Sequence, residues 1–183
     1  MIKLKDILFE GVNDPGIFKA IFIAGGPGSG KTYIAKQLFG IPDRFNISMT
    51  GLKMVNSDKE LKHLLTKYGF GTDLDKMPDE VFKDLTMPGG SGLRNYSKEL
   101  TAQRMKLYKQ GRLGMIIDGT GHDFSKIQSM KKDLEKDGYD TYMTFVNTSL
   151  EVAQQRNQGR DRILPPALLE KSWKDVQKNL GSF

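Results

Sequence analysis

The chain has 183 residues, enough for one domain with a sizeable buried core. Its hydrophobic content of 38% and charged content of 27% are ordinary for a globular protein and exclude a fibrous or disordered class. The net charge of +6 favours anionic partners such as nucleotides or nucleic acid, although a modest positive charge also serves solubility.

The sequence contains no cysteine, which excludes disulfides, thiolate chemistry and Cys-ligated zinc. This composition fits a reducing cytoplasm, and we expect the protein to act in the cytoplasm of a bacterial or phage-infected cell. No apolar run approaches the roughly 20 residues of a membrane span, so we expect no membrane partner. The first ten residues mix charges with apolar positions, which predicts a short amphipathic helix rather than a signal peptide.

Apolar, β-favouring stretches alternate with helical patterns along the chain, which predicts a three-layer α/β/α fold with a parallel central sheet. The predicted strands are 18–24, 52–55, 115–118 and 142–146, and the predicted helices are 31–39, 59–67, 78–85, 94–110, 123–137, 149–158 and 166–179. The glycine-rich segment 89–92 is typical of a hinge.

Between the first strand and its helix lies a segment that fits the pattern G-x-x-x-x-G-K-[ST] at every required position. It comprises Gly25, Gly26, Pro27, Gly28, Ser29, Gly30, Lys31 and Thr32. Glycines let backbone N–H groups approach an anion, and these groups hold phosphate oxygens together with the helix N-terminus. Lys31 is predicted to reach the β- and γ-phosphates of ATP, and the Thr32 hydroxyl to bind Mg²⁺. The alternative is a glycine-rich turn that binds nothing.

Asp58 follows the second predicted strand, at the edge of the sheet that also holds the glycine-rich loop. A carboxylate there can accept a proton from an incoming hydroxyl group, as a kinase aspartate does. Aspartate is also a common N-cap residue before a helix, so the spacing alone leaves both roles open for Asp58.

The stretch 69–112 carries basic residues with tyrosines between them, a pattern that suits a polynucleotide. These residues are Arg94, Tyr96, Lys98, Arg104, Lys106, Tyr108, Lys109 and Arg112. A charged outer helix face explains the same pattern, and we leave both interpretations open.

Asp118 ends the apolar strand 115–118 and resembles a Walker B acid, which would approach the Mg²⁺ shell. The alternative is an Asx-turn residue that closes the strand. His122 lies in the loop that follows, where a lone histidine is more often a hydrogen-bonding residue than a catalyst.

Arginines gather at the end of the helix 149–158. Arg156 lies in its last turn, and Arg160 and Arg162 lie in the loop beyond it. The planar guanidinium suits phosphate oxygens and can stabilise the charge that develops during phosphoryl transfer. A solvated helix end with favourable dipole contacts is the alternative.

Taken together, these motifs resemble a known group, the P-loop kinases that include the kinase domain of phage polynucleotide kinase and the zeta toxins. The resemblance rests on the glycine-rich loop, on Met115-Ile-Ile-Asp118-Gly-Thr120, on Glu151-Val-Ala-Gln-Gln-Arg156-Asn157-Gln-Gly-Arg160 and on Ile163-Leu164-Pro165. It implies that Arg160 sits in a lid over ATP with Arg156 beside it. It also implies that Asp58, in the stretch Asn56-Ser57-Asp58, is the general base.

The chain departs from the group at one position. Leu61 stands where the family places an arginine that holds a phosphate of the acceptor, with Lys59, Lys62 and His63 around it. No phosphatase segment follows the kinase motifs, so we do not expect a bifunctional end-healing enzyme in this chain.

The motifs therefore predict one P-loop kinase domain over 1–183, with an N-terminal extension at 1–16 and a helical, substrate-side insertion at 69–112. We expect an ATP- and Mg²⁺-dependent kinase whose acceptor is a hydroxyl of a nucleic acid or nucleotide. The catalytic residues would be Lys31, Asp58, Arg156 and Arg160, with Thr32 and Asp118 at the metal. The oligomeric state stays open.

Three other functions remain open. A zeta-toxin-like kinase would phosphorylate a nucleotide-sugar, and such an enzyme could have an antitoxin-like partner. A P-loop switch or ATPase would have no phosphoacceptor. The segment 118–121 matches the D-x-x-G pattern of GTPases, but no N-K-x-D motif for guanine occurs in the chain. A P-loop binding module without catalysis is a further alternative.

Overall fold

The computed structural model describes residues 14, 16–42, 45–72, 76–86, 92–160 and 163–182. Three sequence predictions lie outside these residues. They are the amphipathic helix in the first ten residues, the hinge at 89–92 apart from its last glycine, and the place of Arg162.

Four parallel strands form the central sheet in the order β2-β3-β1-β4. The strands are β1 (Lys19–Ala24), β2 (Lys53–Val55), β3 (Met115–Asp118) and β4 (Asp140–Phe145). In the register, Ile23 of β1 lies opposite Asp118 of β3 and Thr144 of β4. All four strands therefore end at the same edge of the sheet, which confirms the predicted α/β architecture.

Helices follow or connect the strands as the sequence pattern predicts. They are α2 (Lys31–Phe39), α3 (Ser57–Lys67), α4 (Asp79–Thr86), α5 (Leu93–Gln110), α6 (Phe124–Lys136), α7 (Leu150–Gln158) and α8 (Pro166–Lys178), followed by the short 3-10 helix η2 (Leu180–Ser182). Most predicted bounds agree with these to within one residue. The larger differences are that α3 and β4 each begin two residues earlier than predicted, and that the sequence pattern did not predict η2.

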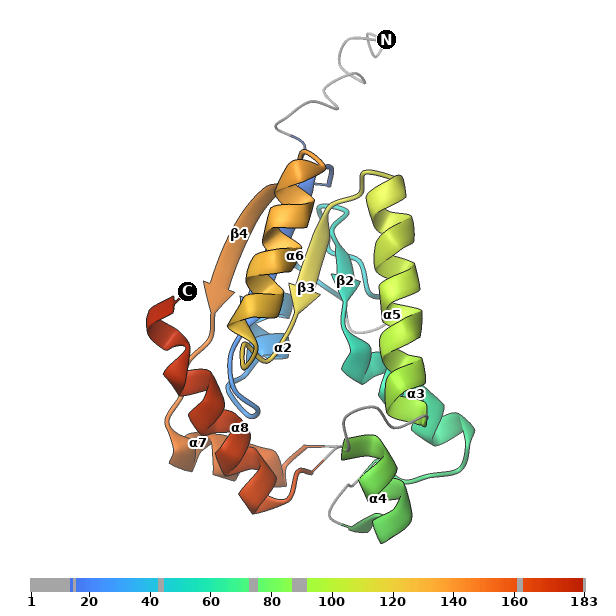
Figure 1. Ribbon diagram of the computed structural model, residues 1–183, viewed down its shortest axis with the longest axis vertical. Coiled ribbons are helices and arrows are strands. Elements are labelled where there is room, and N and C mark those ends of the chain that lie inside the picture. Colours follow the sequence, from blue (N-terminus) through green and yellow to red (C-terminus); the bar gives the residue numbers. More distant parts are fainter. Residues whose placement is uncertain are drawn as a thin grey trace, which may run out of the picture.

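Side chains alternate between the two faces of the sheet because successive residues of a strand point to opposite sides. Phe22, Met115 and Ile117 pack in one cluster with Met105 of α5 and Met130 of α6. Figure 1 shows α5 and α6 side by side over this face of the sheet, with α2 behind it.

The opposite face carries a second apolar cluster. Ile23, Met54 and Ile116 pack there with Ala35 of α2. The sheet is therefore the middle of three layers, and its β1 and β3 strands are buried on both sides.

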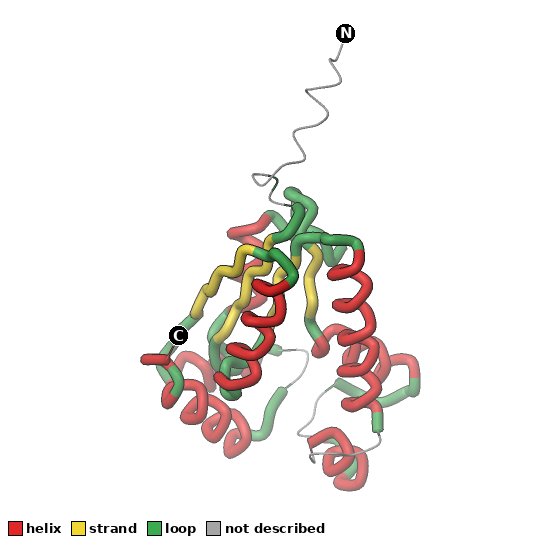
Figure 2. The backbone as a smooth tube through the Cα atoms, turned by 45° about the horizontal axis from the view of Figure 1, so that its top comes forward, coloured by secondary structure: helices red, strands yellow, loops and turns green. Residues whose placement is uncertain are grey.

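The remaining helices lie beyond the carboxyl edge of the strands. Figures 1 and 2 show α3 and α4 on one side of this edge and α7 and α8 on the other. A third apolar cluster contains Leu61 and Leu65 of α3 together with Ala153 of α7 and Leu169 of α8. These helices build the surroundings of the edge at which the glycine-rich loop begins. In the described part of the chain, no helix is both long enough and apolar enough to cross a membrane.

Replacing the fully buried Ile116 tests the core. We expect Ile116→Ala to lower the free energy of unfolding by about 2–5 kcal/mol, because the change removes buried apolar contacts and leaves a cavity between β1 and β2. Leu107 of α5 is 63% exposed, so Leu107→Ala is the control and should change stability by less than about 0.5 kcal/mol. Denaturant titration measures both, and equal losses would contradict the assignment of the core.

Candidate active site

The glycine-rich loop joins β1 to α2 and adopts a conformation that requires glycine. Gly28 and Gly30 have φ angles of +77° and +93°, in the left-handed region that side chains disfavour. A Cβ atom at Gly28 would lie 2.6 Å from the carbonyl oxygen of Ala153 in α7. The backbone N–H of Gly25 donates to the carbonyl of Thr120, 3.3 Å away, which ties the loop to the segment after β3.

The N-terminus of α2 is open at this loop. Gly30 is the N-cap residue and provides no side-chain hydrogen bond to the first turn. The free N–H groups and the helix dipole together favour an anion there. The Ser29 hydroxyl is buried in the same loop without a hydrogen-bond partner among the described residues. Such a group costs about 1–3 kcal/mol and is typical of functional sites.

Lys31 folds back over its own loop. Its Nζ donates to the carbonyls of Gly25 and Gly26, at 2.8 and 3.0 Å. Burial lowers the pKa of Lys31, the carboxylate of Asp118 acts in the opposite direction, and Arg160 lowers the pKa further. The loop therefore holds a cationic group in a site that disfavours its charge, and an anionic ligand would relieve this.

Asp118 ends β3 beside Lys31, as the strand order requires. Asn56, which follows β2, donates from Nδ2 to Oδ2 of Asp118 over 2.7 Å. Burial raises the pKa of Asp118 to about 6, opposed first by Lys31, while Asp58 raises it further. The carboxylate thus lies close to both residues, although it reaches this edge from a different strand than either.

Asp58 is not the N-cap residue of α3. The side-chain oxygen of Asn56 accepts a hydrogen bond from the backbone N–H of Asp58 over 2.7 Å, which makes Asn56 the cap. Asp58 lies in the first turn, and its carboxylate accepts a hydrogen bond from Arg94 of α5 at 2.8 Å. The N-cap interpretation is therefore wrong, because the favoured capping residue two positions earlier already fills that role.

The arginines reach the site from α7 and the loop after it. Arg156 donates from Nη1 to the carbonyl of Ser29 over 3.1 Å. Arg160 lies near enough to Lys31 and Asp118 to affect the pKa of both. The buried Asn157 fixes the loop that carries Arg160, because its side chain bonds both backbone groups of Leu164.

Three contributions were not predicted from the sequence. Asn56 links α3 to Asp118, Arg94 pairs with Asp58, and Trp173 of α8 packs against the loop at Gly26. Asparagine before a helix is a readable N-cap signal, whereas the sequence gives no signal for the other two contacts. His122 hydrogen bonds to Thr120, as expected of a loop histidine.

The fold resembles solved structures of P-loop kinase-like proteins. A structure of AvrRxo1-ORF1:ORF2 with ATP matches at a TM-score of 0.63 and 14% identity over 90% of this chain and 48% of that one. A structure of the Pnkp1/Rnl/Hen1 RNA repair complex matches at a TM-score of 0.59 and 16% identity, over 94% of this chain and 48% of that one. A structure of the PezAT toxin–antitoxin system of Streptococcus pneumoniae matches at a TM-score of 0.53 and 15% identity, over 76% of this chain and 51% of that one.

The chain thus spans about half the length of each of these three chains. No family model matches the sequence, and no curated protein does. The comparisons show the fold that the chain shares with these structures, and the functional argument rests on the site itself.

The raised pKa of Asp118 predicts a pH-dependent penalty in the protein without nucleotide or metal. The folded state binds the proton more tightly than the unfolded state, so stability falls as the pH rises from about 4 to about 6. Asp118→Asn keeps the shape and the hydrogen bond from Asn56 but removes this penalty. We expect the variant to be more stable than the wild type by about 1–3 kcal/mol at pH 8 and equal to it at pH 4.

Denaturant titrations across this pH range measure the difference between the two proteins. A constant difference at every pH would contradict the assigned environment of Asp118.

Proposed function

We propose that the protein is a kinase that transfers the γ-phosphate of ATP to a hydroxyl group of a nucleic acid or nucleotide. One observation carries the proposal. Lys31, Asp58 and Asp118 come from three separate segments and meet at the open N-terminus of α2, close enough for each aspartate to affect the pKa of Lys31. An anion-binding helix end beside two carboxylates suits a triphosphate that faces an acceptor hydroxyl.

In the proposed reaction, Asp58 accepts the proton of the acceptor hydroxyl. The hydroxyl oxygen then forms a bond to the γ-phosphorus, the bond from that phosphorus to the β,γ-bridging oxygen breaks, and ADP leaves. Lys31 neutralises the β- and γ-phosphates, while the loop N–H groups hold their oxygens. Because Asn56 caps α3, the Asp58 carboxylate is not used as the cap, and it pairs with Arg94 of α5 instead.

Arg156 and Arg160 supply further positive charge. Arg156 fixes the loop through the Ser29 carbonyl, and Arg160 lies close to Lys31 and Asp118. We assign Arg160 to the phosphoryl group in transfer, where a planar guanidinium matches its oxygens. The burial of Asn157 supports this role, because its bonds to Leu164 hold the loop in place.

Thr32 and Asp118 fit a magnesium ion by the chemistry of their donor atoms. A hydroxyl and a carboxylate are oxygen ligands, and Mg²⁺ is usually held by one or two protein groups together with water and phosphates. This agrees with the finding that no group of three or more metal-binding side chains gathers among the described residues. A bound Mg²⁺ would neutralise the phosphates and orient them.

The net charge of +6 supports a nucleic-acid or nucleotide acceptor. The match to an RNA repair complex is a second, weaker support. A nucleotide-sugar acceptor is the alternative, favoured by the match to a toxin–antitoxin system, and it would add an inhibitory protein partner. A switch or ATPase without a phosphoacceptor is the remaining alternative, and the Asp58→Asn variant separates it from a kinase.

Asp58→Asn separates catalysis from donor binding. We expect the rate of transfer from γ-labelled ATP to fall by about 10²–10⁴-fold, because the base is lost, while the affinity for ATP changes little. Asp79→Asn, an exposed aspartate in the first turn of α4, is the control and should keep full activity.

The acceptors to be tested are 5′-hydroxyl oligonucleotides, nucleosides, nucleotides and nucleotide-sugars. Label on nucleotide-sugars alone would replace the proposed acceptor with the alternative. Release of inorganic phosphate without a labelled acceptor, unchanged in Asp58→Asn, would overturn the kinase assignment.

A further inference from the structure

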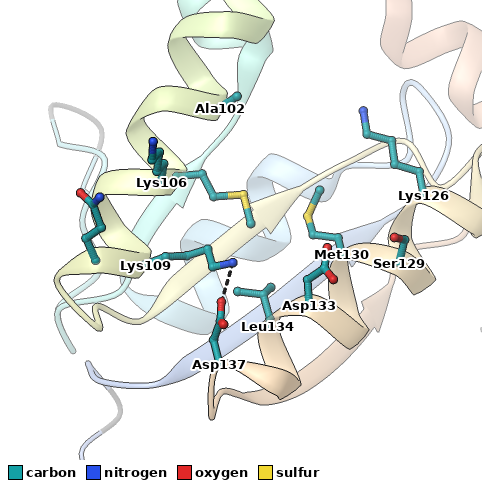
Figure 3. A pocket seen from close by; sticks show the side chains of 11 residues that line it. Ala102, Lys106, Lys109, Lys126, Ser129, Met130, Asp133, Leu134 and Asp137 are labelled. Atoms are coloured by element: carbon teal, nitrogen blue, oxygen red, sulfur yellow. Dashed lines mark ion pairs between the residues drawn. The ribbon is translucent and has the colours of Figure 1, made fainter.

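A groove lies between α5 and α6, on the face of the sheet opposite α2. Its volume is about 780 Å³, and its floor includes Met105, Met130 and the buried Leu134. Figure 3 shows Lys109 of α5 reaching toward Asp137 of α6, with Lys126 at the far side on α6. Lys106 of α5 also lines the groove. The proposed transfer reaction does not use any of these side chains.

The groove leads to the candidate active site. Both α5 and α6 begin at the carboxyl edge of the strands, as Figure 1 shows. Arg94, in the first turn of α5, bonds to Asp58, and Lys98 lies one turn further along the same helix face. The next positions on this face, Ala102 and Lys106, line the groove. This face of α5 therefore extends from the partner of Asp58 into the groove.

Cationic side chains dominate the end of the groove nearest to Asp58. Burial lowers the pKa of Lys98, and the neighbouring charges of Arg94 and Lys126 lower it further, which shows that the three cations lie near one another. In the part of the chain that the structure describes, neither Lys106 nor Lys126 forms an ion pair.

The acidic groups of the groove lie toward its other end. Asp137 is neutralised there by Lys109, with 2.6 Å between Nζ and Oδ2, and Asp133 precedes it by one turn of α6. The positive charge of the groove therefore increases toward the site of transfer. A bound polyanion would have its end drawn toward Asp58.

We propose that this groove binds the single strand of a nucleic acid whose terminal hydroxyl is presented to Asp58. The inference rests on the proposed function. The phosphates would follow Lys98, Lys106 and Lys126, and the bases would contact the methionines of the floor, whose side chains adapt to flat apolar surfaces. From Arg94 to Lys109, α5 rises by roughly 22 Å, a length that suits several nucleotides.

This choice of occupant depends on charge and on continuity. A nucleic-acid strand must bring its end to Asp58, and Lys126 and Lys98 continue the positive charge of the groove to Arg94, the partner of Asp58. An acidic protein segment could also bind to lysines and methionines. Such a segment would not need to extend along α5 as far as Asp58. The test treats such a partner as a different outcome.

Charge reversal on one helix provides the test. Lys126 and Lys132 are both exposed lysines of α6, but only Lys126 lines the groove. We expect Lys126→Glu and Lys106→Glu each to weaken binding of a 5′-hydroxyl oligonucleotide by about 3- to 10-fold and to reduce the salt dependence of binding, whereas Lys132→Glu changes affinity by less than about 2-fold. Fluorescence anisotropy of a labelled oligonucleotide measures this without any transfer reaction.

A kinetic measurement separates binding from folding. The two groove variants should raise KM for the oligonucleotide but leave the affinity for ATP and the melting temperature unchanged. Equal oligonucleotide affinity in all three variants, or no oligonucleotide binding by the wild type, would overturn the proposal, and the groove would then suit a protein partner.

The two proposals fail in different ways. If the groove variants weaken oligonucleotide binding but no phosphate is transferred, the kinase assignment is wrong and the groove remains a nucleic-acid site. If phosphate is transferred to small acceptors but Lys106→Glu and Lys126→Glu do not change the affinity for oligonucleotides, the kinase assignment stands and the groove proposal is wrong.

Discussion

Lys31 donates its side-chain amine to two carbonyls of its own loop, and the rest of the site is arranged around this cation. Burial lowers the pKa of Lys31 and so disfavours its charge, while the carboxylates of Asp118 and Asp58 act in the opposite direction. Neither carboxylate is close to Lys31 in the sequence. The sheet places β3 beside β1 and β2 next to β3, which brings the carboxyl ends of β2 and β3 to the same loop. The strand order therefore determines which side chains meet at this loop.

At this carboxyl edge of the sheet, the buried core fixes the positions of the loops that form the candidate site. Apolar residues on both faces of β1 and β3 fix the positions of Ile23 and Asp118 relative to each other. The loop is then fastened by Thr120, by Arg156 from α7 and by Trp173 from α8. Thr120 follows β3, whereas α7 and α8 both follow β4. The binding of a ligand at the loop would therefore depend on how the contacts at the carboxyl edge of the sheet are packed.

Much of this arrangement could be predicted from the sequence. The alternation of apolar strands and helical patterns predicted the sheet, and the glycine-rich motif predicted the loop, because both signals depend on residues that are neighbours in the chain. Asp118 could be placed at the edge because it ends an apolar strand. The roles of Lys31, Thr32, Asp58, Asp118, Arg156 and Arg160 in transfer stay predictions that the geometry supports.

The rest depended on contacts between distant segments. Asp58 was open to two interpretations until Asn56 proved to be the cap, and Arg94 could not be matched to Asp58 because α5 lies 36 residues further along the chain. The early start of β4 at Asp140 follows from its pairing with Lys19, which no local pattern encodes. Side-chain partners of this kind are set by the packing of helices on the sheet, not by propensity.

The most direct measurement of the central claim is a crystal structure with a non-hydrolysable ATP analogue and Mg²⁺. The account predicts the triphosphate in the loop 25–32, with Nζ of Lys31 on the β- and γ-phosphate oxygens and the γ-phosphate facing Asp58. A nucleotide bound elsewhere, or one whose γ-phosphate turns away from Asp58, would contradict it.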